Sequence, residues 1–142
     1  MPYVSDTHSI IWHMTDDPKL SARAKEIFEK VDNGQDYIII PCIVFFELLY
    51  LTEKKKLHIE FDSFIGAVSS SRNYRVEPSC LPIIEKSKVI SRGEIPDPWD
   101  RLIAATSMHL DFLLITRDKS MQKVGLKIIR RWQVIILKSL KR

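Results

Sequence analysis

Four acidic residues stand out because each interrupts a stretch that is otherwise apolar or that opens a helix. Asp6 ends the strand-like run PYVSD, and Glu47 is the only charge in CIVFFELLYL. Asp100 lies in PDPWDRLIAAT, and Asp118 follows FLLIT by one residue. Two unit charges about 4 Å apart repel by roughly 4 kcal/mol at an effective dielectric of about 20. If these acids converge, we expect a divalent cation between them, and an oxygen-only donor set favours Mg²⁺ or Mn²⁺ over zinc.

Each acid also has an ordinary structural explanation. Asp6 could cap the helix that begins at the next residue, where the helix dipole favours a carboxylate. Asp118 could be a turn residue in TRDKS. Glu47 is harder to explain, because a helix that is apolar on nearly all sides is usually buried, and a buried carboxylate needs a cationic partner, a proton or a metal ion. Thr116 carries a hydroxyl that could orient a ligand or water, or could simply end the strand.

The DPWDR segment contains two acids with different expected roles. Asp97 is followed by Pro98, which fits a helix N-cap with proline at the first helical position. Asp100 then falls at the third helical position, where an acid can reach back toward the cap. We assign Asp97 to the cap, where it supports the site from outside, and Asp100 to the site itself.

The chain ends in a basic segment. From Lys119 to Arg142 there are eight basic residues and no acidic ones. Such a segment can be a solvated face with a basic tail, but directly after Asp118 it also fits a rim that contacts phosphates. The candidates for this rim are Lys119, Lys123, Lys127 and Arg130.

Strand-like and helical patterns alternate along the chain. The strands are expected at 3–5, 37–40, 74–77, 112–116 and near 126–129. The helices are expected at 7–14, from the cap Ser21 to Gly34, and at 42–54, 61–70, 81–91 and 98–109. This alternation predicts an α/β fold with a parallel sheet covered by helices on both faces. In open α/β sheets the site lies beyond the carboxyl ends of the strands, and Asp6 and Asp118 both fall there.

Composition indicates one domain of an ordinary soluble protein, with 142 residues of which 45% are hydrophobic and 28% charged. No apolar run approaches the roughly 18 residues of a membrane span, and the N-terminus MPYVSD has no basic or apolar signal region, so we expect a cytoplasmic protein. Cys42 and Cys80 lack CxxC spacing and are expected to be small buried residues in a reducing compartment. The sequence has no HExxH, GxSxG, Walker or GxGxxG motif, which argues against zinc-protease, serine-hydrolase and nucleotide-cofactor chemistry.

In order and spacing, DTHxxxW from Asp6 to Trp12, FFELLYL around Glu47, DPWDRLIAAT and ITRD resemble the motifs of PIN-domain ribonucleases, and most closely those of VapC-type toxins of toxin–antitoxin pairs. The resemblance spans about residues 3–132. It implies a three-layer sandwich with about five parallel strands, and Mg²⁺ or Mn²⁺ held by Asp6, Glu47, Asp100 and Asp118. It also implies a homodimer and a small antitoxin protein that blocks the cleft, for which the helical surfaces 45–51 and 61–68 are candidate docking sites.

We therefore expect a metal-dependent endoribonuclease that hydrolyses RNA with metal-activated water, with no membrane association. The alternatives are a PIN nuclease for RNA processing or for DNA, without an antitoxin, and a non-catalytic nucleic-acid-binding module. Two departures from the family pattern concern Trp99, where Phe is more usual, and PCIVFFE, which has no Ser or Thr just ahead of its Glu. Residues 133–142 run past the usual end of the domain and are expected to form a basic extension.

Overall fold

The computed structural model describes residues 2–128 and 135–136. Within them, five strands form one parallel sheet in the order β3-β2-β1-β4-β5. Their bounds are β1 Tyr3–Ser5, β2 Ile38–Pro41, β3 Tyr74–Glu77, β4 Leu113–Thr116 and β5 Ile135–Ile136. The central strands are rich in Ile, Val and Leu and are largely buried, as expected for a sheet covered on both sides.

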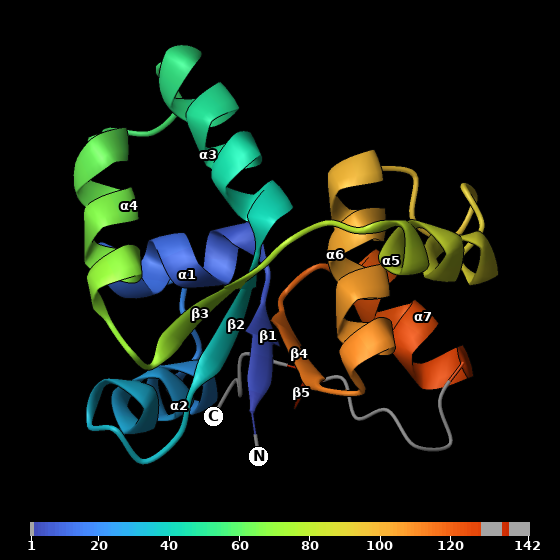
Figure 1. Ribbon diagram of the computed structural model, residues 1–142, viewed down its shortest axis with the longest axis horizontal. Helices are drawn as coiled ribbons and strands as arrows, with labels where there is room; N and C mark the ends of the chain where they lie inside the picture. The colour runs from blue at the N-terminus through green and yellow to red at the C-terminus, as the bar shows by residue number, and fades with distance from the viewer. Residues whose placement is uncertain (1, 129–134, 137–142) are drawn as a thin grey trace.

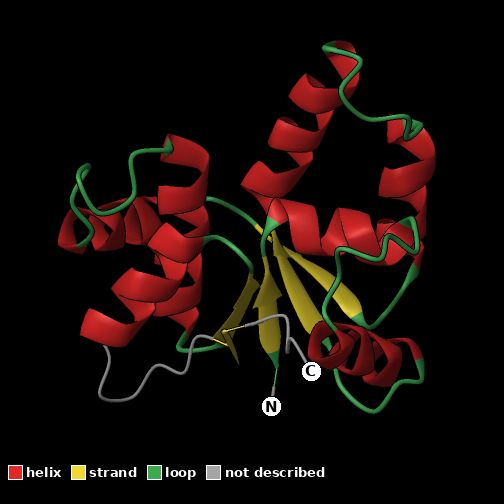
Figure 2. Cartoon of the chain, turned by 180° about the vertical axis from the view of Figure 1, so that it is seen from behind, coloured by secondary structure: helices red, strands yellow, loops and turns green. Residues whose placement is uncertain are grey.

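The helices are α1 Thr7–Met14, α2 Ala22–Asp32, α3 Cys42–Glu53, α4 Phe61–Ser70, α5 Leu81–Lys86, the 3₁₀ turn η1 Ser87–Val89, α6 Pro98–Leu110 and α7 Lys119–Ile128. They lie on both faces of the sheet, with α1 and α2 in front of the strands when the molecule is seen from behind (Figure 2). The α3 and α4 helices lie at one end of the molecule, while α5, α6 and α7 are grouped beside β4 (Figure 1). This architecture confirms the predicted α/β class.

Local sequence explains where α2 begins and ends. The Ser21 hydroxyl accepts a hydrogen bond from the Ala24 amide at 3.2 Å, which is the predicted N-cap. Buried positions repeat at helical spacing, at Ala24, Ile27, Phe28 and Val31. Just beyond the helix, Gly34 has a φ of +76°, a left-handed conformation in which a side chain would be strained. Its amide donates to the Val31 carbonyl at 3.0 Å and closes the turn.

The prediction of the last strand near 126–129 is wrong. Residues 126–128 belong to α7, and Ile129 lies outside the described residues. A short apolar run can belong to either element, and here the helical period prevails, because Met121 and Val124 are both buried at a spacing of three. The fifth strand is instead Ile135–Ile136, which pairs with Ile115 and Thr116 of β4. This part of the expected extension 133–142 therefore belongs to the sheet.

The α3 helix is less buried than its sequence predicts. Val44 and Leu48 are fully buried, but Phe46 is 57% and Tyr50 45% exposed, because α3 points away from the sheet beyond its first turns (Figure 1). Cys42, at the start of this helix, is exposed rather than buried, which corrects the expectation for this thiol. Cys80 is half-buried and packs against the core.

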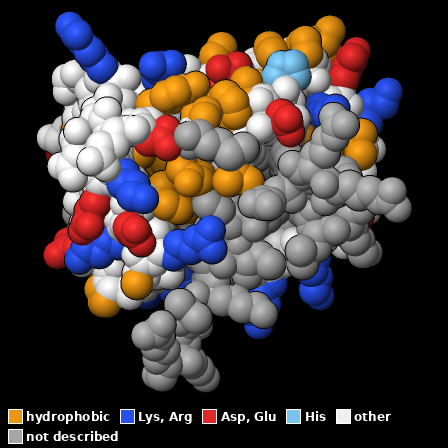
Figure 3. Space-filling model, turned by 90° about the horizontal axis from the view of Figure 1, so that it is seen from below, with side chains coloured by type: hydrophobic (Ala, Val, Ile, Leu, Met, Phe, Trp, Pro, Cys, Tyr) orange, Lys and Arg blue, Asp and Glu red, His pale blue; other side chains and the backbone are white. Residues whose placement is uncertain are grey.

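The described helices include none long and apolar enough to cross a membrane. The amino ends of the central strands face the side of the molecule shown in Figure 3, where Lys and Arg side chains are scattered around the margin. The carboxyl ends of the strands point the opposite way, toward the first turns of α1 and α3 (Figure 1). The residues singled out for chemistry lie at that second end.

Candidate active site

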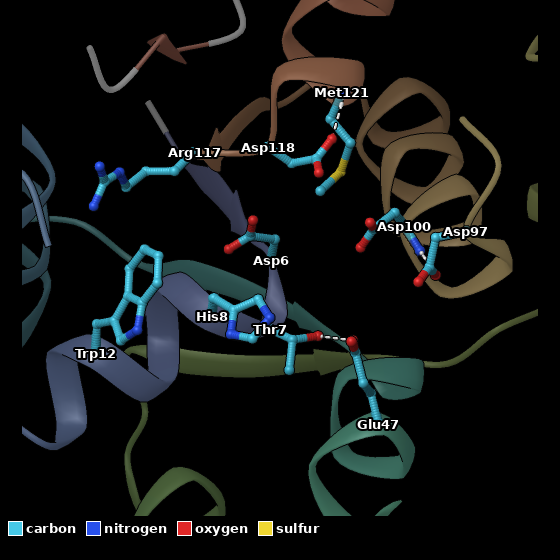
Figure 4. A pocket seen from close by; sticks show the side chains of 10 residues that line it. All are labelled: Asp6, Thr7, His8, Trp12, Glu47, Asp97, Asp100, Arg117, Asp118 and Met121. Atoms are coloured by element: carbon cyan, nitrogen blue, oxygen red, sulfur yellow. Dashed lines mark hydrogen bonds between the residues drawn. The ribbon is translucent and has the colours of Figure 1, made fainter. Parts of the chain in front are cut away.

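A pocket of about 280 Å³ lies beyond the carboxyl ends of β1 and β4 (Figure 4). All four acids predicted from the sequence line it, together with side chains from α1, α6 and α7. The lining residues are Asp6, Thr7, His8, Trp12, Glu47, Asp97, Asp100, Arg117, Asp118 and Met121. Neighbouring parallel strands explain part of this convergence, because β1 pairs directly with β4 and the Asp6 amide donates to the Ile115 carbonyl at 3.2 Å.

Three of the four acids lie at helix N-termini. Asp6 caps α1, with its Oδ1 accepting from the Ser9 amide at 2.9 Å, and its side chain is buried. Asp118 accepts from the Met121 amide at 2.9 Å at the start of α7. Asp100 lies in the first turn of α6. A helix N-terminus carries partial positive charge, so each of these positions favours an ionised carboxylate.

Asp97 is the N-cap of α6, as predicted. Its Oδ1 accepts hydrogen bonds from the Trp99 amide at 2.8 Å and the Asp100 amide at 3.1 Å, and Pro98 occupies the first helical position. The Asp97 side chain is exposed at the edge of the pocket. It therefore contributes a negative charge to the site as well as a cap.

Thr116 hydrogen-bonds to two of the acids. Its hydroxyl oxygen accepts a hydrogen bond from the Asp118 amide at 3.0 Å. The same buried hydroxyl hydrogen-bonds the Asp6 carboxylate, an interaction that lowers the pKa of Asp6. Thr116 thus fixes the position of one acid and stabilises the charge of the other. Its supporting role in a metal site stays a prediction.

Glu47 reaches the pocket from the middle of α3. It is half-buried, and its Oε2 accepts a hydrogen bond from the Thr7 hydroxyl of α1. The hydroxyl that PCIVFFE lacks just ahead of Glu47 is thus supplied by the residue that follows Asp6. Thr7 was not predicted as a site residue, although its place directly after the candidate ligand Asp6 was a usable signal.

Burial and mutual repulsion make the ionised carboxylates unfavourable. Burial raises the pKa of Asp6 above its ordinary value although Ser9 and Thr116 oppose the shift, and burial also raises the pKa of Glu47. The pKa of Asp100 rises to about 8, first because of burial and then because of the negative charges of Asp97, Asp118, Glu47 and Asp6. The four acids therefore interact electrostatically across the pocket.

The donor set fits a hard divalent cation by its chemistry, since all four candidate ligands are carboxylates. As the side chains stand, however, the described part of the chain contains no group of three or more carboxylate, imidazole or thiol side chains arranged to hold one metal ion. Asp100 and Glu47 are only half-buried and come from different helices, so rotation of their side chains can change the spacing.

Three further residues on the pocket wall were not predicted as site residues. Trp12 stacks against His8, with ring centroids 5.6 Å apart. The Arg117 guanidinium lies 5.5 Å from the centre of the Trp12 ring, and its Nη1 donates to the Lys19 carbonyl at 2.6 Å. The place of Arg117 directly before Asp118 was the signal that could have identified it.

The structure describes half of the predicted basic rim. Lys119 and Lys123 are both exposed on α7, which begins beside Asp118. The side chain of Lys127 and the whole of Arg130 lie outside the described residues.

Residues 3–127 match the PIN domain, and the chain belongs to this family. It is 25% identical over 118 residues to Ribonuclease VapC22 of Mycobacterium tuberculosis, with 82% of this chain and 87% of that protein aligned. The solved structure of VapBC2 from Rickettsia felis, bound to a DNA fragment from their promoter, is similar with a TM-score of 0.65 at 18% identity, covering 94% of this chain and 97% of that chain. The solved structure of VapBC-1 from nontypeable Haemophilus influenzae is similar with a TM-score of 0.63 at 22% identity, covering 94% of this chain and 98% of that chain. The motif resemblance to PIN domains is confirmed.

Three substitutions distinguish the roles of Asp97 and Asp100 in the DPWDR segment. Asp97→Ala removes the cap of α6 and should lower the free energy of unfolding by about 0.5–2 kcal/mol. Asp97→Asn keeps a capping oxygen and should cost little, while Asp100→Asn should leave the metal-free protein equally or more stable because it removes one charge from a repelling group. Urea denaturation of the three variants measures these differences. A large loss of unfolding free energy for Asp100→Asn, with no loss for Asp97→Ala, would reverse the two assignments.

The raised pKa of Asp100 makes stability depend on pH. Between its ordinary value of 3.8 and about 8 the folded protein holds a proton that the unfolded chain has lost, so this contribution to stability decreases as pH rises through that window. The melting temperature of metal-free Asp100→Asn, minus that of the unsubstituted protein, should therefore increase from about pH 4 to about pH 8 and then level off. A difference that stays constant across the window would show that Asp100 titrates normally.

Proposed function

We propose that this chain is a metal-dependent endoribonuclease that hydrolyses phosphodiester bonds of RNA with water as the nucleophile. The observation that carries the proposal is that one pocket is lined by Asp6, Glu47, Asp100 and Asp118. Burial first, and then the charges of the neighbouring acids, raise the pKa of Asp100 there. Membership of the PIN family and similarity to a protein named as a ribonuclease support the choice of reaction.

Asp6, Asp100, Asp118 and Glu47 would hold one or two Mg²⁺ or Mn²⁺ ions through their carboxylate oxygens. A bound divalent cation lowers the pKa of the attacking water and offsets the negative charge that develops on the phosphate oxygens. The hydrogen bond from the Met121 amide to Oδ1 fixes the side chain of Asp118. Glu47 is held through Oε2 alone, which accepts from the Thr7 hydroxyl. Oε1 of Glu47 can then accept a hydrogen bond from the water and orient it toward the phosphate.

The substrate would approach over the basic side of α7. Lys119 and Lys123 are exposed there and would contact phosphates on either side of the cleaved bond. Lys127 and Arg130 are proposed to make the same kind of contact. Such contacts are independent of sequence and weaken with salt. A Lys119→Ala, Lys123→Ala double variant should therefore lose affinity for several unrelated RNAs by a similar factor. A loss of affinity confined to one RNA would argue against a phosphate-contacting rim.

We also propose that the enzyme is the toxin of a type II toxin–antitoxin pair and acts in the cytoplasm. The similar Rickettsia felis and Haemophilus influenzae structures are VapBC complexes. An antitoxin could block the pocket with an arginine, whose planar fork matches a carboxylate. The exposed Phe46 and Tyr50 of α3 could contact the remainder of such an antitoxin. The prediction of a second docking surface at 61–68 is wrong in part, because Phe64 and Val68 are buried in the core.

A homodimer is the proposed assembly of the free enzyme. The α5–η1 segment exposes three large apolar side chains, since Leu81 is 66%, Ile84 50% and Val89 53% exposed. A second copy of this chain would remove these side chains from water. Sedimentation velocity should show a dimer that Ile84→Asp dissociates, and a monomeric unsubstituted protein would exclude this assembly.

The reaction is tested with the purified chain and a panel of structured RNAs. Cleavage should require Mg²⁺ or Mn²⁺, stop on addition of a chelator, and fall by at least about a hundredfold in Asp100→Asn. Asp97→Asn, which keeps the cap but lies at the edge of the pocket, should retain much of the activity. Metal-independent cleavage, or full activity of Asp100→Asn, would contradict the mechanism.

The toxin role has its own test in cells. Expression of the chain should slow growth, expression of Asp100→Asn should not, and co-expression of an adjacent small gene should restore growth. Unaffected growth at confirmed soluble expression would exclude a toxin while leaving the nuclease activity open to the test in vitro.

A further inference from the structure

Among the described residues that line the acidic pocket, Arg117 is the one with a Lys or Arg side chain. Its side chain and that of Trp12 lie on one side, while Asp97, Asp100 and Glu47 lie on the other, with Asp6 and Asp118 between them (Figure 4). Arg117 is exposed and directly precedes Asp118, at the junction of β4 and α7. Its guanidinium group lies on the Trp12 side of the pocket (Figure 4).

The guanidinium is held by neutral groups. Its Nη1 donates to the Lys19 carbonyl at 2.6 Å, and its central carbon lies 5.5 Å from the centre of the Trp12 ring. Among the residues that the structure describes, no carboxylate forms an ion pair with Arg117. An arginine whose only purpose was to neutralise the acids would be expected to bond to one of them, because the arginine fork and a carboxylate form paired hydrogen bonds.

The anchoring leaves Arg117 suited to an anionic ligand. Guanidinium has five N–H donors, and the bond to Lys19 uses one of them. The contact with the Trp12 ring limits the positions that the side chain can take, so less conformational freedom is lost when a ligand binds. The remaining fork matches two oxygens of a phosphate group, which a flexible lysine contacts only as a point charge.

We propose that Arg117 binds a phosphate of the RNA next to the one that is cleaved. The inference rests on the proposed function and assigns it a specific contact. A polyanion that approaches Asp6, Asp118 and the other acids is repelled, and Arg117 supplies positive charge on the side of the pocket away from Glu47 and Asp100. Its contact is with a group that does not react, so it stabilises bound substrate and transition state equally.

Steady-state cleavage of one single-stranded RNA separates this role from others. Arg117→Ala should raise KM by about ten- to a hundredfold with kcat nearly unchanged. This change is expected when a charge-assisted hydrogen bond that is equally strong in the substrate complex and the transition state is lost. Arg117→Lys should recover part of the loss. Arg75→Ala is the matched control, because Arg75 is also exposed and lies over an aromatic ring, 3.8 Å from Tyr37, but on β3 outside the pocket.

Binding without cleavage gives a second readout in an Asp100→Asn background. Adding Arg117→Ala should make the dependence of RNA affinity on salt shallower by roughly 0.7 in the log–log slope, the value for one phosphate contact with a single strand. Unchanged KM and slope in a protein that still cleaves RNA would overturn the role of Arg117 alone. A fall in kcat at constant KM would place Arg117 on the reacting phosphate instead. If the unsubstituted protein neither binds nor cuts RNA, the proposed function falls and this role with it.

Discussion

Several carboxylates surround one pocket, and the fold must offset both their burial and their mutual repulsion to hold them there. Two unit charges about 4 Å apart repel by roughly 4 kcal/mol at an effective dielectric of about 20. A helix N-terminus returns about 0.3–1 kcal/mol and a capping hydrogen bond about 0.5–2 kcal/mol. The caps at Asp6 and Asp118 therefore reduce the repulsion without cancelling it. The pKa of Asp100 is raised to about 8, first by its burial and then by the negative charges around it. A proton on Asp100 relieves part of this cost in the metal-free protein, and a divalent cation would do so in the proposed enzyme.

The parallel sheet is what allows the acids to meet. The adjacent strands β1 and β4 end at the same edge, and α1 and α7 begin directly after Asp6 and Asp118. These two acids are therefore set by backbone hydrogen bonds and by the shared hydroxyl of Thr116. Asp100 and Glu47 come from separate helices and are half-buried. The site thus combines two rigid acids with two that can adjust to a ligand.

Patterns with a local physical cause were predictable from the sequence. The Asp97–Pro98 start of α6, the Ser21 cap and the central strands all follow from neighbouring residues. The end of the sheet was not predictable, because the apolar residues at 126–128 suit a strand as well as the helix that they form. The contact of Thr7 with Glu47 and the placement of Arg117 over Trp12 were also missed, since each joins elements distant in the sequence. Convergence of the acids was inferred from strand ends, but their present spacing depends on side-chain positions that no motif encodes.

The most direct measurement is calorimetric titration of Mn²⁺ into the purified chain, freed of any inhibitor, at about pH 7 in two buffers with different heats of ionisation. Binding should release protons, because Asp100 holds its proton up to about pH 8 and must lose it to become a ligand. Asp100→Asn should bind more weakly and release fewer protons, whereas Asp97→Asn should still bind. Absence of Mn²⁺ and Mg²⁺ binding, or equal binding and proton release by Asp100→Asn, would show that the acids do not assemble around a cation.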